Sequence, residues 1–264
     1  MNPHRLGLIV PSSNTTMETE LPQYFQAAER LSGERITHHG SRMRMARVTP
    51  EELARMDRES ERCALELRDL EPSAVAYACL VAIMAGGPRY HVEAEARLRA
   101  ALGAMGRATP VVTSAGALVR CVHRLRAKRV AILTPYVKPL TAIVARYLEE
   151  CGIEVVDALG LEIDDNLAVG RIDPMDLLEH LHRLDKARAD AVVLSACVQM
   201  PSLEAVPLAE LMANRPVLTA AGATAFELLE HCGLPVDLPL GGALFQPRDS
   251  SAPSLRGLAQ RLSA

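Results

Sequence analysis

Two short aliphatic runs in this chain each lead to a cysteine, although they lie far apart in the sequence. The first is Ala74–Ala78 before Cys79, and the second is Ala189–Ala196 before Cys197. Apolar runs of this length, bounded by polar or turn-forming residues, predict buried strands of a parallel sheet. Ligands of α/β proteins bind beyond the carboxyl ends of such strands. We therefore expect the two cysteines to face one pocket.

Other segments are also duplicated. Arg129–Leu133 matches Arg5–Ile9 in character, and Pro216-Val-Leu-Thr-Ala-Ala-Gly222 repeats Pro110-Val-Val-Thr-Ser-Ala-Gly116. Self-similarity at about half the chain length, with strands alternating with helices, predicts two copies of one α/β unit. The expected fold is two pseudo-symmetric parallel-sheet α/β domains with the active site in the cleft between them. Residues 1–112 with 220–264 would form a discontinuous first lobe, and residues 113–219 the second.

Several helix starts can be predicted from local patterns. Thr15-x-x-Glu18 has the form of a capping box, Thr49 precedes a helix that runs to about Asp69, and Asp173-Pro-Met-Asp176 opens another. Residues 250–264 are expected to form a frayed terminal helix. Arg42 and Arg44 lie on one face of a predicted strand, where they could attract an anionic substrate or form a solvated or subunit-facing stripe.

Composition excludes several classes of function. A net charge of -3 gives no reason to expect a nucleic-acid or membrane partner, and no apolar run approaches a membrane span. The N-terminus runs directly into a strand, so no signal peptide is expected and the predicted location is cytoplasmic. The six cysteines are scattered, which argues against disulfides and structural zinc. Neither a phosphate loop nor a GxGxxG motif is present, so no cofactor and no metal are expected.

Five polar residues fall at predicted strand ends or in nearby turns: Asn14, Cys79, Tyr136, Asn166 and Cys197. Taken singly, each has a plain structural interpretation as a buried thiol, a turn or cap residue, or a packing aromatic. The duplication favours a functional one. A cysteine near a helix N-terminus is expected to favour its thiolate, and amides with a phenol can hold a carboxylate. The pattern indicates acid–base or nucleophilic chemistry on a small acid.

Six motifs resemble the maleate cis–trans isomerase family of the aspartate/glutamate racemase superfamily over nearly the whole chain, to about residue 248. They are Pro11-Ser-Ser-Asn-Thr-Thr-Met-Glu-Thr-Glu20, Ser41-Arg-Met-Arg-Met45, Tyr77-Ala-Cys-Leu-Val-Ala82, Leu133-Thr-Pro-Tyr136, Asp165-Asn-Leu-Ala-Val-Gly170 and Val198-Gln-Met-Pro-Ser-Leu203. The resemblance implies conversion of maleate to fumarate without a cofactor, and a homodimer.

The same resemblance implies a role for each site residue. Cys79 is the nucleophile that gives a succinyl-cysteine, and Cys197 is the proton donor and acceptor on the opposite side. Asn14, Tyr136 and Asn166 hold the carboxylates, and the backbone N–H groups of Leu80, Val81 and Val198 complete an anion cradle. The sequence leaves open whether the covalent adduct is a full intermediate.

Two alternatives remain open at this point, a racemase and a binding protein, and a third family is argued against. Amino-acid racemases of the aspartate/glutamate type also use two thiols, but no extra acidic partner for an α-amino group is evident. Arylmalonate decarboxylases share the fold but use a single catalytic cysteine, so Cys79 argues against them. A non-catalytic dicarboxylate-binding protein would explain the two-lobed duplication alone.

Overall fold

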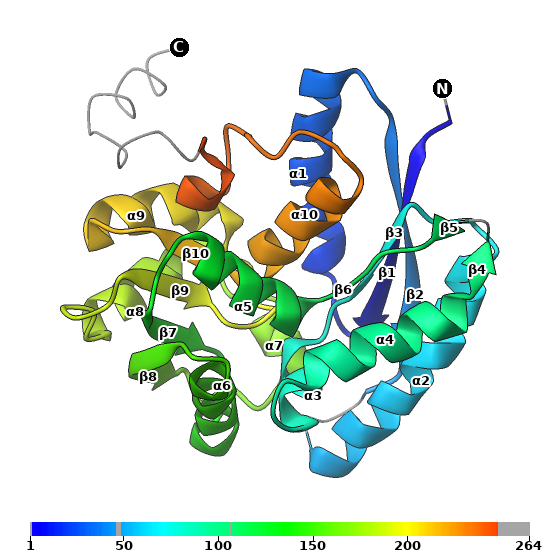
Figure 1. Ribbon diagram of the computed structural model, residues 1–264. Coiled ribbons are helices and arrows are strands. Elements are labelled where there is room, and N and C mark those ends of the chain that lie inside the picture. The colour runs from blue at the N-terminus through cyan, green and yellow to red at the C-terminus, as the bar shows by residue number, and fades with distance from the viewer. Residues whose placement is uncertain (1, 46–48, 106, 248–264) are drawn as a thin grey trace.

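The computed structural model describes residues 2–45, 49–105 and 107–247, and it contains two four-stranded parallel sheets (Figure 1). The first has the order β2-β1-β3-β6, formed by β1 (His4–Pro11), β2 (Ile36–Met43), β3 (Ala74–Tyr77) and β6 (Val111–Thr113). The second has the order β10-β9-β7-β8, formed by β7 (Arg129–Thr134), β8 (Glu154–Gly160), β9 (Ala191–Ser195) and β10 (Val217–Thr219). A short antiparallel pair, β4 (Ala104–Met105) and β5 (Arg107–Ala108), lies apart from both.

The two sheets have the same topology, as the sequence duplication predicted. In chain order, the first, second, third and fourth strands of each sheet are arranged 2-1-3-4. Cys79 follows the third strand of the first sheet, β3, and Cys197 follows the third strand of the second, β9. The α/β fold with two similar lobes is thereby confirmed, and the cysteines occupy equivalent places in the two lobes.

Helices alternate with these strands and cover both sheets (Figure 1). They are α1 (Met17–Ser32), α2 (Pro50–Arg68), α3 (Leu80–Ala85), α4 (Tyr90–Leu102), α5 (Ser114–Arg124), α6 (Lys138–Glu150), α7 (Asn166–Val169), α8 (Leu177–Arg183), α9 (Val206–Ala213) and α10 (Ala220–His231), with single 3-10 turns η1 (Pro174–Asp176), η2 (Leu203–Ala205) and η3 (Gly242–Phe245). The central strands β3 and β9 are buried along their whole length. None of the described helices is long and apolar enough to cross a bilayer.

The repeated Pro-Val-x-Thr-x-Ala-Gly segment has a physical explanation at the start of α5 and α10. Thr113 accepts a hydrogen bond from the N–H of Gly116 at 3.1 Å, and Thr219 accepts one from Gly222 at 2.9 Å, so each threonine caps its helix. A Cβ on either glycine would lie 2.9 Å from the capping hydroxyl oxygen. The motif therefore pairs each threonine cap with the small residue that the cap requires.

Helices α5 and α10 pack against each other, and each contacts strands of both sheets (Figure 1). This pair therefore packs against both lobes. Helix α10 also contacts α1 and β3 of the first lobe, which fits the predicted return of the chain to that lobe. The boundaries at residues 112 and 219 stay a prediction.

The predicted helix starts are confirmed, but the capping box predicted for the first is wrong. Thr49 accepts from the N–H of Glu52 at 3.3 Å at the start of α2, and Asp173 accepts from Met175 at 2.9 Å before α8. Helix α1, however, begins at Met17, whose N–H donates to the Oδ1 of Asn14 at 3.1 Å. Asn14, rather than Thr15, therefore provides the cap. The helix predicted at residues 250–264 lies outside the described residues.

Candidate active site

Cys79 and Cys197 line the same cavity, each at the carboxyl end of its strand. Both side chains are buried, with about 4% of their surface exposed. Cys79 immediately precedes α3, and Cys197 begins the irregular loop between β9 and η2. The free volume between the lining residues is about 20 Å³, close to what one water molecule needs. The cleft is therefore closed.

The structure brings all the residues that the sequence singled out to this one cavity. Besides the two cysteines, the predicted lining residues are Asn14, Leu80, Val81, Tyr136, Asn166 and Val198. Pro11, Met45 and Gln199 line it as well and were not predicted. Gln199 could have been predicted from the sequence, because it is a polar residue two positions after Cys197. Met45 had none, because its position depends on the path of the chain beyond β2.

Cys197 has several hydrogen-bond donors around its sulfur. The N–H of Gln199 donates to the Sγ at 3.3 Å. Burial raises the pKa of the Cys197 thiol, whereas the Tyr136 hydroxyl and the N–H groups of Gln199 and Met200 lower it. Burial has the larger effect, so the thiol is neutral in the closed cleft. The donors would nevertheless stabilise a negative charge that reached this sulfur during a reaction.

Cys79 has less support for its thiolate. Burial raises the pKa of Cys79 to about 12, opposed only by a hydrogen bond from the N–H of Ala82, while Cys197 and Asp57 raise it further. The sequence predicted that a strand end before a helix favours the thiolate. The backbone contributes in that direction, but desolvation outweighs it in the closed cleft. The prediction that Cys79 favours its thiolate is therefore wrong for the closed cleft of this structure.

Asn14 connects the two lobes at the edge of the cavity. Its Nδ2 donates to the carbonyl oxygen of Val198 at 3.1 Å, and its Oδ1 accepts from Met17. The side chain is fully buried. Because an amide nitrogen carries two hydrogens, one N–H remains for a ligand. Asn14 thus fits both interpretations of the sequence, because it caps α1 through its Oδ1 and offers an N–H donor at the cavity through its Nδ2.

Asn166 and Tyr136 come from the second lobe. Asn166 is the first residue of α7, and Asp165 caps this helix by accepting from Leu167 at 2.8 Å. The Nδ2 of Asn166 is buried and has no hydrogen-bond partner. Buried donors are rarely left unpaired, because each costs free energy. An unpaired amide beside the cavity is therefore available to an anionic ligand. The Tyr136 hydroxyl is also buried, and desolvation raises its pKa well above the usual value, which keeps it a neutral donor.

Leu80, Val81 and Val198 contribute backbone to the cavity wall. Leu80 and Val81 begin α3, where the first N–H groups have no partner within the helix. Val198 lies between Cys197 and Gln199 on the loop, and its carbonyl accepts the bond from Asn14. These positions fit the predicted anion cradle.

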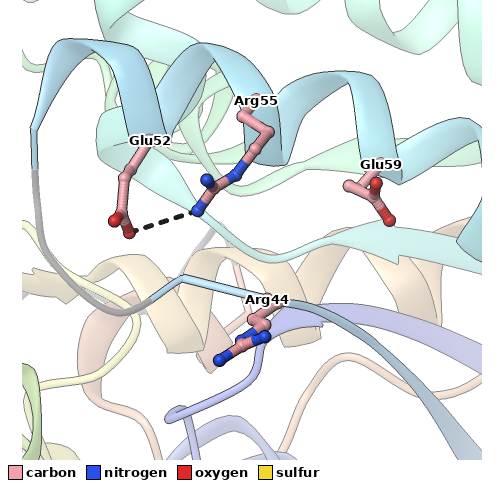
Figure 2. A pocket seen from close by; sticks show the side chains of 4 residues that line it. All are labelled: Arg44, Glu52, Arg55 and Glu59. Carbon is pink, nitrogen blue, oxygen red and sulfur yellow. Dashed lines mark ion pairs between the residues drawn. The ribbon is translucent and has the colours of Figure 1, made fainter.

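A second hollow, larger and more polar, lies beside α2 (Figure 2). Its volume is about 560 Å³, and it is lined by Arg44, Glu52, Arg55 and Glu59. The guanidinium of Arg55, which is exposed, lies 3.6 Å from the carboxylate of the half-buried Glu52, three residues earlier on α2. Neither cysteine lines this hollow. Its four lining side chains are two arginines and two glutamates, with no cysteine to act as a nucleophile, so it is not the candidate active site.

Arg42 and Arg44 do not reach the cavity between the cysteines. The guanidinium of Arg42 forms an ion pair with Glu18 and donates to the carbonyl oxygens of Ser12 and Asn14, the latter at 2.9 Å. Arg42 thus holds the loop that carries Asn14, and Arg44 is exposed. The substrate-attracting interpretation is therefore not supported, and the choice between a solvated and a subunit-facing stripe stays a prediction. Within the described ranges, no group of three His, Cys, Asp or Glu side chains is arranged to hold a metal ion.

Comparisons with known proteins agree with this geometry. The family model for arylmalonate decarboxylases matches residues 6–245. A curated relative, the maleate isomerase of Geobacillus stearothermophilus, is 52% identical over 241 residues, which cover 91% of this chain and 96% of the relative.

Two solved structures are also similar. One is an alanine variant of a cysteine in the maleate isomerase of Pseudomonas putida S16, with maleate, at a TM-score of 0.91 and 50% identity, covering 94% of this chain and 99% of that chain. The other is a cysteine-to-serine mutant of the maleate isomerase of Nocardia farcinica with a covalently bound succinylcysteine intermediate. It has a TM-score of 0.88 and 43% identity and covers 94% of this chain and 100% of that chain.

Proposed function

This chain belongs to the maleate isomerase family, and from that premise we propose that it converts maleate to fumarate by reversible addition of a cysteine thiolate. The observation that carries the proposal is the convergence of Cys79 and Cys197, from equivalent strands of two lobes, on one buried cavity. Unpaired or partly free donors line the same cavity, which suits a small dicarboxylate. The family model is named for decarboxylases, but the curated relatives at 44 to 52% identity are maleate isomerases.

The proposed first step is addition to the double bond. The thiol of Cys79 first gives its proton to water, and the resulting thiolate attacks one alkene carbon, while the π electrons move toward the carboxylate on the other carbon. The thiol of Cys197 then protonates that second carbon. The product is a succinyl group on Cys79 and a thiolate on Cys197. The succinylcysteine in the Nocardia farcinica structure supports this type of intermediate.

The remaining steps reverse the addition after rotation. The former double bond is now single, so the two carboxylates can rotate apart. The thiolate of Cys197 removes a proton from the carbon that it protonated, the C–S bond to Cys79 breaks, and the double bond forms again in the trans geometry. No atom or electron is gained or lost overall, so the proposed reaction needs no cofactor.

The environments of the two sulfurs support different roles. Cys197 accepts hydrogen bonds from Tyr136 and two backbone N–H groups, so it is suited to carry negative charge after it gives up a proton. Cys79 is the less stabilised thiolate, with a pKa near 12 in the closed cleft. A poorly stabilised thiolate is the more reactive nucleophile once ionised. We propose that Asn14, Tyr136 and Asn166 bind the carboxylates with the N–H groups of Leu80, Val81 and Val198.

The direct test is to incubate the protein with maleate and no added cofactor and to follow fumarate by proton NMR. Cys79→Ser and Cys197→Ser should each abolish turnover. Retention of a near-wild-type rate by either variant would reject the corresponding role. Exchange of deuterium into aspartate or glutamate without maleate turnover would instead favour a racemase.

The oligomeric state and location are also proposals. We propose a homodimer on the basis of the family resemblance, and light scattering coupled to size-exclusion chromatography tests it through the molar mass. The cytoplasmic location stays a prediction from sequence, which cell fractionation tests.

A further inference from the structure

The residues just before α1 and in its first turn, in the first lobe, hold the loop that carries Cys197 in the second. Three side chains within seven residues make these bonds. Asn14 donates to the carbonyl of Val198 at 3.1 Å, and the hydroxyl of Thr16 donates to the carbonyl of Gln199 at 2.7 Å. One oxygen of Glu20 then accepts from the backbone of the same loop, slightly further along the chain.

Glu20 is the least expected member of this set. Its side chain is buried, yet its Oε1 accepts from the N–H of Ser202 at 2.5 Å and of Leu203 at 2.8 Å. Burial raises the pKa of Glu20, and the two N–H donors lower it. A carboxyl group removed from water costs free energy unless it is hydrogen-bonded. The buried position of Glu20 is therefore explained by the loop, whose backbone donors Ser202 and Leu203 lie at the start of η2, outside any strand.

The bonds from α1 end on the residues that support the sulfur of Cys197. Gln199 donates its N–H to that sulfur at 3.3 Å, while its carbonyl is held by Thr16. The hydroxyl of Ser195 donates to the carbonyls of Cys197 at 2.8 Å and Met200 at 3.1 Å, which closes the loop on itself. With Gln199 fixed at both ends and Ser202 fixed by Glu20, the N–H groups that face the sulfur have little freedom to turn away.

We propose that Thr16 and Glu20 are positioning residues for Cys197, which hold the loop of the second lobe so that its backbone N–H groups point at the sulfur. The inference rests on the proposed function for its consequence in catalysis, but the geometry of the sulfur can be tested without turnover. The same bonds link the two lobes, because Thr16 and Glu20 belong to one lobe and Cys197 belongs to the other.

The experiment compares Glu20→Ala with a matched control, Glu210→Ala. Glu210 is also a buried carboxylate that accepts two backbone N–H groups, from Val217 at 3.0 Å and Ala243 at 2.8 Å, but neither belongs to the Cys197 loop. The rate of iodoacetamide labelling is measured for each cysteine by peptide mass spectrometry as a function of pH. In Glu20→Ala, the midpoint for Cys197 should rise by about one pH unit, as for the loss of one hydrogen bond to a charged group.

The midpoint for Cys79 should not move in Glu20→Ala, and neither cysteine should respond in Glu210→Ala. In maleate turnover, kcat should fall in Glu20→Ala with little change in KM, because the substrate donors are intact. Glu20→Gln keeps the accepting oxygen and should restore both readouts. If Glu20→Ala does not fold, Thr16→Val replaces it, since it removes one hydroxyl at nearly constant volume.

If the pH profile of Cys197 labelling is unchanged in Glu20→Ala, or shifts equally in Glu210→Ala, the positioning role is overturned. The proposed function would still stand as long as the wild-type protein isomerises maleate. Absence of maleate turnover by the wild-type protein would overturn the proposed function instead. The labelling profile would still report whether Glu20 controls the environment of Cys197.

Discussion

Replacing Tyr136 by phenylalanine tests whether the hydroxyl on Cys197 contributes to the chemistry. The ring of Tyr136 is buried, and its hydroxyl forms a hydrogen bond to Cys197 that lowers the pKa of the thiol. Phenylalanine keeps the ring and removes only the donor. The substitution therefore keeps the ring in the cavity wall and removes the hydroxyl that bonds to Cys197 and that we also propose to bind a substrate carboxylate.

The expected size of the loss in kcat/KM follows from the type of hydrogen bond that the substitution removes. A hydrogen bond to a charged group contributes about 1.5–3 kcal/mol, and each 1.36 kcal/mol is a factor of ten in rate. We expect kcat/KM to fall about 10- to 150-fold. The same free energy raises the pKa of Cys197 by about one to two units, which should appear as a shift of its alkylation profile to higher pH.

The assay is the conversion of maleate to fumarate followed by NMR, with thermal unfolding as a check on the fold. Tyr147→Phe is the matched control, because Tyr147 is another buried tyrosine, and its hydroxyl accepts from the backbone N–H of His91 at 3.1 Å and lies 2.5 Å from the Nδ1 of that residue, away from the cysteine cavity. It should keep near-wild-type kcat/KM. Equal losses in the two variants, or no loss in Tyr136→Phe, would refute the reasoning.

Three further predictions concern other parts of the molecule. Asp57 accepts from Arg97 at 2.8 Å and raises the pKa of Cys79, so Asp57→Asn should lower that pKa below about 12 and speed alkylation of Cys79 at pH 8; an unchanged rate would contradict this. Gly160→Ala would place a Cβ 2.5 Å from the carbonyl oxygen of Tyr136. The substitution should therefore lower the free energy of unfolding, measured by urea titration, by about 1–3 kcal/mol and should also reduce kcat/KM. Wild-type values of both quantities would show that the turn relaxes freely. The bonds from Arg129 and neighbouring N–H groups lower the pKa of Asp190 to about 2. The ionised carboxylate therefore stabilises the folded protein above the unfolded pKa, and this stabilisation is lost as pH falls through the folded pKa. Asp190→Asn should lower the free energy of unfolding by about 1 kcal/mol at pH 7 and by little at pH 2, and an equal loss at both pH values would exclude this linkage.

Much of the fold could be predicted because the duplication constrains it. Strands that are buried on both faces are legible as aliphatic runs, and the repeated threonine and glycine mark equivalent helix starts. The capping box at Thr15–Glu18 failed for a reason that sequence does not contain. Asn14 is held by Val198 from the other lobe, and that contact fixes where α1 begins.

The candidate site was predictable in composition but not in its energetics. Strand-end positions were enough to bring Cys79 and Cys197 together, whereas their pKa values depend on burial that only the packed lobes create. Met45 and the bonds of Glu20 were not predictable either, because they join segments without a shared pattern. Glu20 and Ser202 are 182 residues apart in the chain.

The most direct test of the central claim is the mass of a trapped adduct. Cys197→Ser is incubated with maleate, digested under acidic conditions, and analysed by peptide mass spectrometry. Our account predicts that the peptide containing Cys79, and no other cysteine peptide, gains the mass of one maleic acid. An adduct on a different cysteine, or normal fumarate production with no adduct, would contradict the assignment of Cys79 as the nucleophile.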